Sequence, residues 1–200
     1  MEHFFLEGEE LENYNYIIMC HNLMLSLVKR ANRHDWHSFK IDIRREDKVE
    51  WEKHDIEYWR LHGYKKEISR MYYQHTFFSL WSDYLDYTYE ATMAASKMKA
   101  SIAYSLLRKP LKDDLYFLEL LENNGVEFIY EFLENPIANF AVDKVSPEAK
   151  KKTISAVTTE VFSEAYGDIL YNIRYSKKEE IRIRKNMESN TTYYNDMSIL

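Results

Sequence analysis

Two side chains in the segment Arg70-Met71-Tyr72-Tyr73-Gln74-His75 are of types that could act together on a phosphate group. The guanidinium group of arginine is a permanently charged, planar fork that matches phosphate geometry. Histidine titrates near neutral pH and is therefore suited to proton transfer. Residues five apart on a regular helix point about 140° from each other. Arg70 and His75 would therefore meet one substrate only at a distorted helix or across a dimer interface. Arg30 and His37 form a second pair of this kind.

An arginine followed a few residues later by a histidine resembles the active-site signature of the HEPN superfamily. These are helical ribonucleases, compact and frequently dimeric, found in toxin and phage-defence systems. The resemblance implies that Arg70 stabilises phosphate charge and that His75 transfers a proton while a 2′-hydroxyl attacks the adjacent phosphodiester. It also implies a metal-independent endoribonuclease that binds RNA as a homodimer. Met71 departs from the signature, which usually has a polar residue directly after the arginine.

A second resemblance covers residues 103–121. This segment is similar to one in uncharacterised bacterial helical proteins, in which Leu-Leu-Arg is followed a turn later by an acid. Here Lys112 occupies the usual acidic place after Arg108, and Asp113 follows it. We expect the leucines of this segment to fill the core and Arg108 to tether a neighbouring element. The resemblance brings no known activity with it.

The sequence predicts no cofactor and no metal. His34 and His37 supply two imidazoles three residues apart, and two nitrogens do not make a metal site. Cys20 is the single cysteine and lies in an apolar run, where we expect a buried small side chain. Glycine-rich phosphate loops and serine-hydrolase elbows have no counterpart in the chain.

Composition favours helices, because only 4 Gly and 3 Pro in 200 residues leave few turn signals for a strand-rich fold. The net charge of -6 argues against a nucleic-acid footprint over the whole protein. Basic stretches at residues 29–45, 150–152 and 182–185 could still bind phosphate backbones if they converge in space.

Apolar residues recur at three- and four-residue steps along most of the chain, as in helices with one buried face. The expected helices cover, in order, residues 11–33, 47–61, 68–108, 111–122, 126–133 and 147–175. We expect Gly63 to break one helix, Pro110 to begin a new one, and Gly125 to end that one. Ser146 and Pro147 are a helix start signal. The predicted fold is all-α: a single helical-bundle domain of about six to eight helices over residues 1–183, followed by a polar, flexible tail over residues 184–200.

A noncatalytic protein-protein interaction module is the alternative function. Its aromatic faces, for example Trp51, Trp59, Trp81 and Tyr84, would dock another protein or a second copy of the chain. The acidic amino terminus lacks the basic and apolar regions of a signal peptide, and no window of the sequence is apolar enough to span a membrane. The sequence therefore predicts a cytoplasmic protein without membrane contact.

Overall fold

The computed structural model describes residues 6–134, 142–162 and 164–175. All regular elements in these residues are helices, and none is a strand, which confirms the predicted all-α bundle of about six to eight helices. The α-helices are α1 (Gly8–Arg33), α2 (Ile56–Leu61), α3 (Lys65–Ser96), α4 (Ala100–Lys109), α5 (Leu115–Asn124), α6 (Val126–Glu134), α7 (Pro147–Val161) and α8 (Glu164–Tyr175). The predicted tail over residues 184–200 lies outside the described residues.

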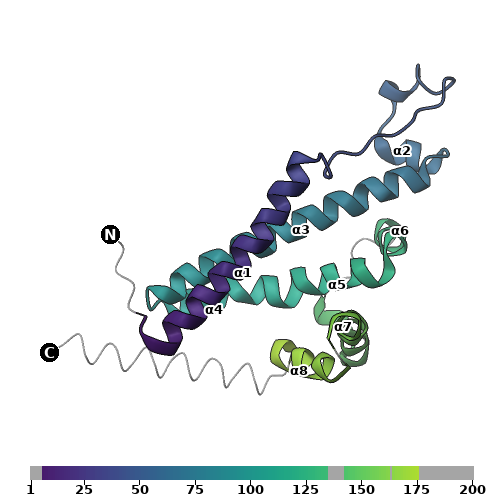
Figure 1. Ribbon diagram of the computed structural model, residues 1–200. Helices are drawn as coiled ribbons and strands as arrows, with labels where there is room; N and C mark the ends of the chain where they lie inside the picture. The colour runs from purple at the N-terminus through teal and green to yellow at the C-terminus, as the bar shows by residue number, and fades with distance from the viewer. Residues whose placement is uncertain (1–5, 135–141, 163, 176–200) are drawn as a thin grey trace.

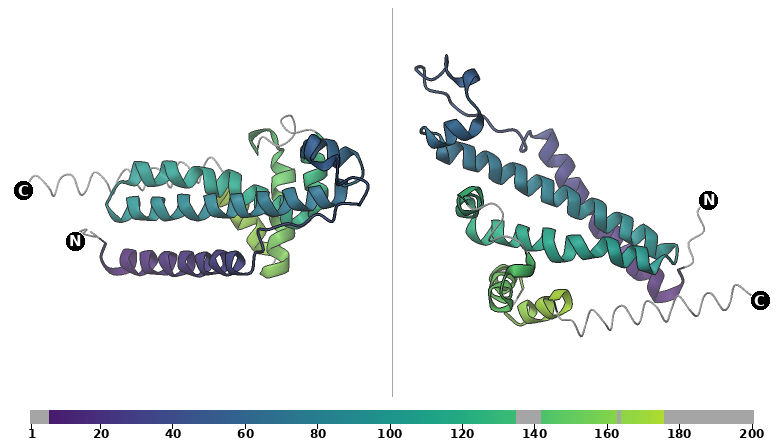
Figure 2. Two further views of the ribbon diagram at one scale, coloured as in Figure 1. Left: turned by 90° about the horizontal axis from the view of Figure 1, so that it is seen from above. Right: turned by 180° about the vertical axis from the view of Figure 1, so that it is seen from behind.

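The long helix α3 is the centre of the arrangement and contacts α1, α2, α4, α5 and α6 (Figure 1). Helix α1 crosses one side of α3. In the view from above, α1 lies along an edge of the molecule beside the α3 and α4 pair (Figure 2). Helices α7 and α8 pack on each other, and α7 packs against α5.

The sequence predicts one helix from residue 68 to 108, and this prediction is wrong. The chain reverses at Lys97–Lys99, so α3 and α4 form an antiparallel hairpin. Met98 takes a positive φ of 58° at this turn, a conformation that is uncommon for residues other than glycine. No glycine or proline marks the turn, which is why the apolar periodicity runs through it unbroken.

Pro110 does not begin a separate helix, contrary to the prediction. A π-helical turn, η2 (Pro110–Asp114), joins α4 to α5, so the helical chain runs on from Ala100 to Asn124. Proline has no N–H to donate and its ring clashes with the preceding turn of an α-helix. The helix widens directly after this residue: the N–H of Leu115 donates to the carbonyl of Pro110 in the i to i+5 pattern.

Helix ends at three other places follow the predicted signals. Gly125 ends α5 with φ 58°. Ser146 caps α7 by accepting from the N–H of Ala149 at 3.2 Å. Gly63, with φ 109°, separates α2 from α3.

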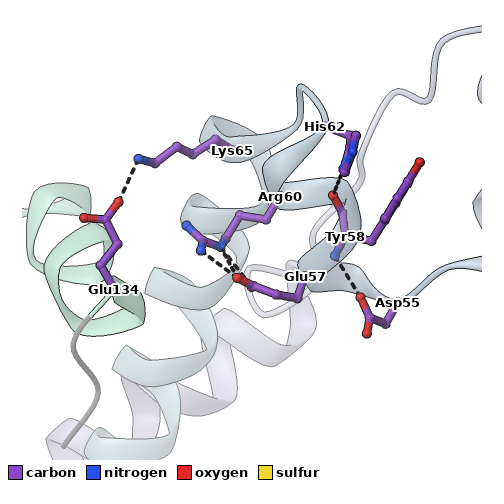
Figure 3. A network of polar contacts seen from close by, with 7 residues as sticks. All are labelled: Asp55, Glu57, Tyr58, Arg60, His62, Lys65 and Glu134. Carbon is purple, nitrogen blue, oxygen red and sulfur yellow. Dashed lines mark hydrogen bonds and ion pairs between the residues drawn. The ribbon is translucent and has the colours of Figure 1, made fainter.

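The helix predicted over residues 47–61 forms only at its end. Turns and a short 3-10 helix, η1 (Trp51–Lys53), precede α2. Asp55 caps α2 by accepting from the N–H of Tyr58 at 2.8 Å (Figure 3). Lys65 at the start of α3 pairs with Glu134 at the end of α6 at 3.1 Å, which ties these two helix ends together.

Two apolar clusters make up the core at this end of the bundle. One is built on Trp59, Tyr64 and Ile68, and the other on Leu121, Phe128 and Ile129. The partly buried ring of Tyr72 on α3 packs against both clusters. The α2 segment is thereby joined to α5 and α6 through one face of α3.

The predicted helix over residues 147–175 divides at Phe162, where the backbone leaves the helical region. The divided helix folds back as the α7 and α8 hairpin. Gly167 makes the close approach of the two helices feasible, because a Cβ atom there would lie 2.5 Å from the hydroxyl of Ser155. The sequence pattern shows the apolar stripe of both helices but not the reversal between them.

Candidate functional site

The structure places Arg70 and His75 on one unbroken stretch of α3, and both side chains are exposed. A regular helix directs them about 140° apart, so a single chain does not bring them to one point. The other pair is also exposed: Arg30 lies near the end of α1, and His37 lies in the segment that follows. The ribonuclease reading of these residues remains a prediction.

The other predicted polar features are ordinary surface contacts. His34 stacks on Trp36 with ring centroids 5.9 Å apart. Among the described residues, no group of three histidine, cysteine, aspartate or glutamate side chains could hold a metal ion. The helix tether expected of Arg108 is made by its neighbour Lys109, whose Nζ lies 2.8 Å from Asp83 and 3.3 Å from Asp114.

Several cations of the predicted basic stretches are engaged with neighbouring side chains. Arg44 is engaged with Asp47 at 2.7 Å and with the ring of Tyr64. Lys150 is buried and lies over the ring of Tyr175 at 4.9 Å. Lys151 pairs with Asp168. Residues 182–185 lie outside the described part of the chain.

The four aromatic residues expected to dock a partner do not form an exposed face. Trp59 is only 4% exposed, and Trp51 stacks on it with centroids 4.8 Å apart. Trp81 and Tyr84 are half-buried along α3. These rings therefore serve packing, and an interaction surface has to be sought elsewhere.

A buried polar cluster anchors α8 to the π turn. Arg174 donates from Nη1 to a carboxylate oxygen of Glu119 at 2.5 Å and from Nε to the carbonyl of Leu111 at 2.8 Å. The hydroxyl of Tyr175 donates to the carbonyl of Lys112 at 2.8 Å. Both carbonyls belong to the π turn. In a regular α-helix they would accept from backbone N–H groups, and here the side chains of Arg174 and Tyr175 donate to them instead.

Burial is the main influence on the pKa values in this cluster. Burial raises the pKa of Tyr175 to about 12. It also raises the pKa of Glu119 above its ordinary value, and the nearby charge of Arg174 offsets part of that rise. The second carboxylate oxygen of Glu119 is buried without a hydrogen-bond partner. The contacts of Arg174 and Tyr175 are directed at backbone carbonyls, and the arrangement fits a structural anchor.

Helix α1 has two apolar faces: an inner face that packs against α3 and an outer face that is exposed. On the inner face, the buried ring of His21 lies 5.1 Å from that of Tyr89, and the hydroxyl of Tyr14 donates to the sulfur of Met93 at 3.5 Å. This face packs against α3. Residues at intervals of three and four keep it continuous, as the sequence predicts.

The outer face of α1 consists of Tyr16, Met19, Leu23 and Leu27. These side chains are 64%, 59%, 66% and 48% exposed. At 100° per residue they fall within an arc of about 80°. Cys20, expected to be buried, lies half-buried at the border of this arc. A continuous apolar stripe of this kind on a surface helix is typical of an interaction surface.

Two further apolar features lie beside this helix and on α8. A cavity of about 360 Å³ opens between α1, α3 and α4, where small side chains such as Ala91, Ala95 and Ala103 leave space. On α8, the exposed apolar side chains follow one helix face and are Tyr166, Ile169, Leu170 and Ile173. Nothing in the described residues covers this face.

Comparisons of the chain with family models, with curated proteins and with solved structures each find no match. The structural evidence for function therefore consists of the surfaces described above. Among the helices that the structure describes, none combines the length and the apolar character needed to span a membrane.

Proposed function

We propose that this chain is a noncatalytic protein-protein interaction module that assembles with a second copy of itself through the outer face of α1. The observation that carries the proposal is the apolar stripe on that face, which is exposed while the opposite face of the same helix is packed. A helix that is apolar on two sides gains stability when both are covered. A second α1 supplies a surface of matching length and character.

The size of the effect follows from the exposure of Leu23. Complete burial of a leucine side chain contributes about 1.5–3 kcal/mol. About two thirds of Leu23 is exposed, so its burial contributes about 1–2 kcal/mol per copy and about 2–4 kcal/mol per dimer. Loss of this contribution corresponds to a dissociation constant about 30-fold to 1000-fold larger.

Sedimentation equilibrium of the wild type, beside Leu23→Lys, tests the proposal. We expect a concentration-dependent dimer for the wild type and a monomer for the variant, with the same helical circular dichroism because Leu23 does not contribute to the core. Ile169→Lys is the matched control, since Ile169 is an exposed apolar residue of α8. A wild type that stays monomeric at all accessible concentrations contradicts the proposal, as does a dimer that only Ile169→Lys dissociates.

An RNA-cleavage assay distinguishes the interaction module from the ribonuclease that the Arg70 and His75 pair predicts. Wild type, Arg70→Ala and His75→Ala are incubated with labelled total RNA and tRNA without metal. An interaction module leaves the RNA intact in all three cases. Cleavage by the wild type that both folded variants lose would replace a noncatalytic role with a metal-independent endoribonuclease.

A further inference from the structure

We infer that the two α1 helices of the dimer pack antiparallel, with the two-fold axis at the level of His21. This inference rests on the proposed function and adds the orientation and register of the partner. It comes from the charged residues that continue the apolar stripe of α1 at both ends.

The stripe and its charged ends follow a heptad-like spacing. Alternating steps of three and four residues connect Glu9, Glu12, Tyr16, Met19, Leu23, Ser26, Arg30 and Arg33. Such spacing keeps one seam of a helix facing a partner helix. Tyr16, Met19 and Leu23 occupy the middle of the seam with Ser26, and Leu27 of the outer face lies beside it. Two acids occupy the amino-terminal end of the seam, and two bases occupy its carboxyl-terminal end.

These positions are arranged symmetrically about His21. Met19 and Leu23 each lie two residues from it, and Glu12 and Arg30 each lie nine residues from it. In an antiparallel pair centred there, Met19 of one copy meets Leu23 of the other, and Glu12 meets Arg30. The same register pairs Glu9 with Arg33. A surface that is complementary to itself in this way is what a two-fold dimer requires.

A parallel pair in the same register would set like charges against each other. Glu12 would face the second Glu12 and Arg30 the second Arg30, which is unfavourable at short range. The charges therefore select the antiparallel orientation.

The helix dipole explains part of this pattern, because acids near the amino end and bases near the carboxyl end stabilise any helix. It does not account for their position around the helix. At 100° per residue, Glu9, Glu12 and Arg30 fall within the arc of the exposed apolar residues, and Arg33 lies about 40° outside it. Glu9, Glu12, Arg30 and Arg33 have no ion-pair partner among the residues that the structure describes, so a second copy can supply one.

The position of α1 allows the approach of a second copy. The helix lies on the near side of α3 in Figure 1 and along an edge of the molecule in the view from above in Figure 2. From Glu9 to Arg33 the seam is about 36 Å long at 1.5 Å per residue.

Charge reversal at one pair tests the orientation. Glu12→Arg and Arg30→Glu are made singly and together, and their dissociation constants are measured by sedimentation at low ionic strength. In the antiparallel dimer each single variant converts two attractive pairs into two repulsive ones. We expect binding about tenfold weaker or more for each, and recovery of wild-type affinity in the double variant, which rebuilds both pairs in reverse.

Lys29→Glu is the matched control, since it makes the same change of charge as Arg30→Glu at an exposed position away from the outer face. It should leave the affinity within about twofold of wild type, and high salt should shrink the effect of the single variants. A wild-type dimer whose affinity neither single variant changes, or which the double variant does not restore, overturns the antiparallel register but leaves the interaction function standing. A monomeric wild type overturns both.

Discussion

Replacing Arg174 by alanine removes the guanidinium group that joins α8 to α5 and the π turn. The side chains of Arg174 and Glu119 are only 3% and 9% exposed, and their ion pair is 2.5 Å long. Removal of one partner leaves the other charge buried, which destabilises a protein by about 3–5 kcal/mol. The carbonyl of Leu111 loses its donor as well. We therefore expect a loss at the upper end of this range.

Urea unfolding followed by circular dichroism at one protein concentration measures the loss. Lys151→Ala is the matched control, because it breaks a 2.9 Å ion pair between α7 and α8 whose side chains are 49% and 57% exposed. Exposed pairs contribute about 0–1 kcal/mol. Equal effects of the two variants would refute the reasoning that burial, and not the ion pair itself, sets the magnitude. The double variant Glu119→Leu with Arg174→Met should recover most of the stability, since no charge is then left unpaired.

Two further outcomes follow from the same region. Burial raises the pKa of Glu119 above its ordinary value of 4.5, so its contribution to stability is present below that value and is lost as pH rises through the raised pKa. The unfolding free energy of wild type, measured by urea titration at a series of pH values, should therefore fall over this range relative to Glu119→Gln. Gly167→Ala forces a Cβ to within 2.5 Å of the hydroxyl of Ser155; it should lower the unfolding free energy by about 1–3 kcal/mol, and a neutral effect would contradict the close packing of α7 on α8.

Local signals in the sequence determine much of this fold. The glycine after α5 and the serine and proline before α7 act within one turn of chain, so their effect is visible without tertiary structure. The two hairpin reversals are different. The turn at Met98 places a methionine at positive φ, and the break at Phe162 has no capping signal in the sequence. Long-range packing against neighbouring helices decides both, and apolar periodicity does not report it.

An apolar interaction surface was predicted from the sequence but was not placed on α1. The sequence predicts an interaction module but assigns its surface to Trp51 and Trp59, whereas these rings pack on each other near α2. Periodicity could not separate the two faces of α1, since His21 and Leu23 both belong to apolar runs and only the position of α3 shows which is covered. The heptad spacing of Glu12 and Arg30 with the apolar stripe was visible in the sequence and is the signal that could have identified the outer face.

The π turn at Pro110 also sets the rotational phase between α4 and α5. A π turn holds about one residue more than an α turn, and each residue of an α-helix corresponds to about 100° of rotation. If the same residues formed a regular α turn, the extra residue would turn all of α5 by about that angle relative to α4. Tyr116 and Glu119 would then leave the side that faces α7 and α8. Deleting one residue within Pro110–Asp114 would instead remove the extra residue and leave the facing of α5 in place. The same deletion inside the regular part of α5 would turn every helical residue that follows by about 100°.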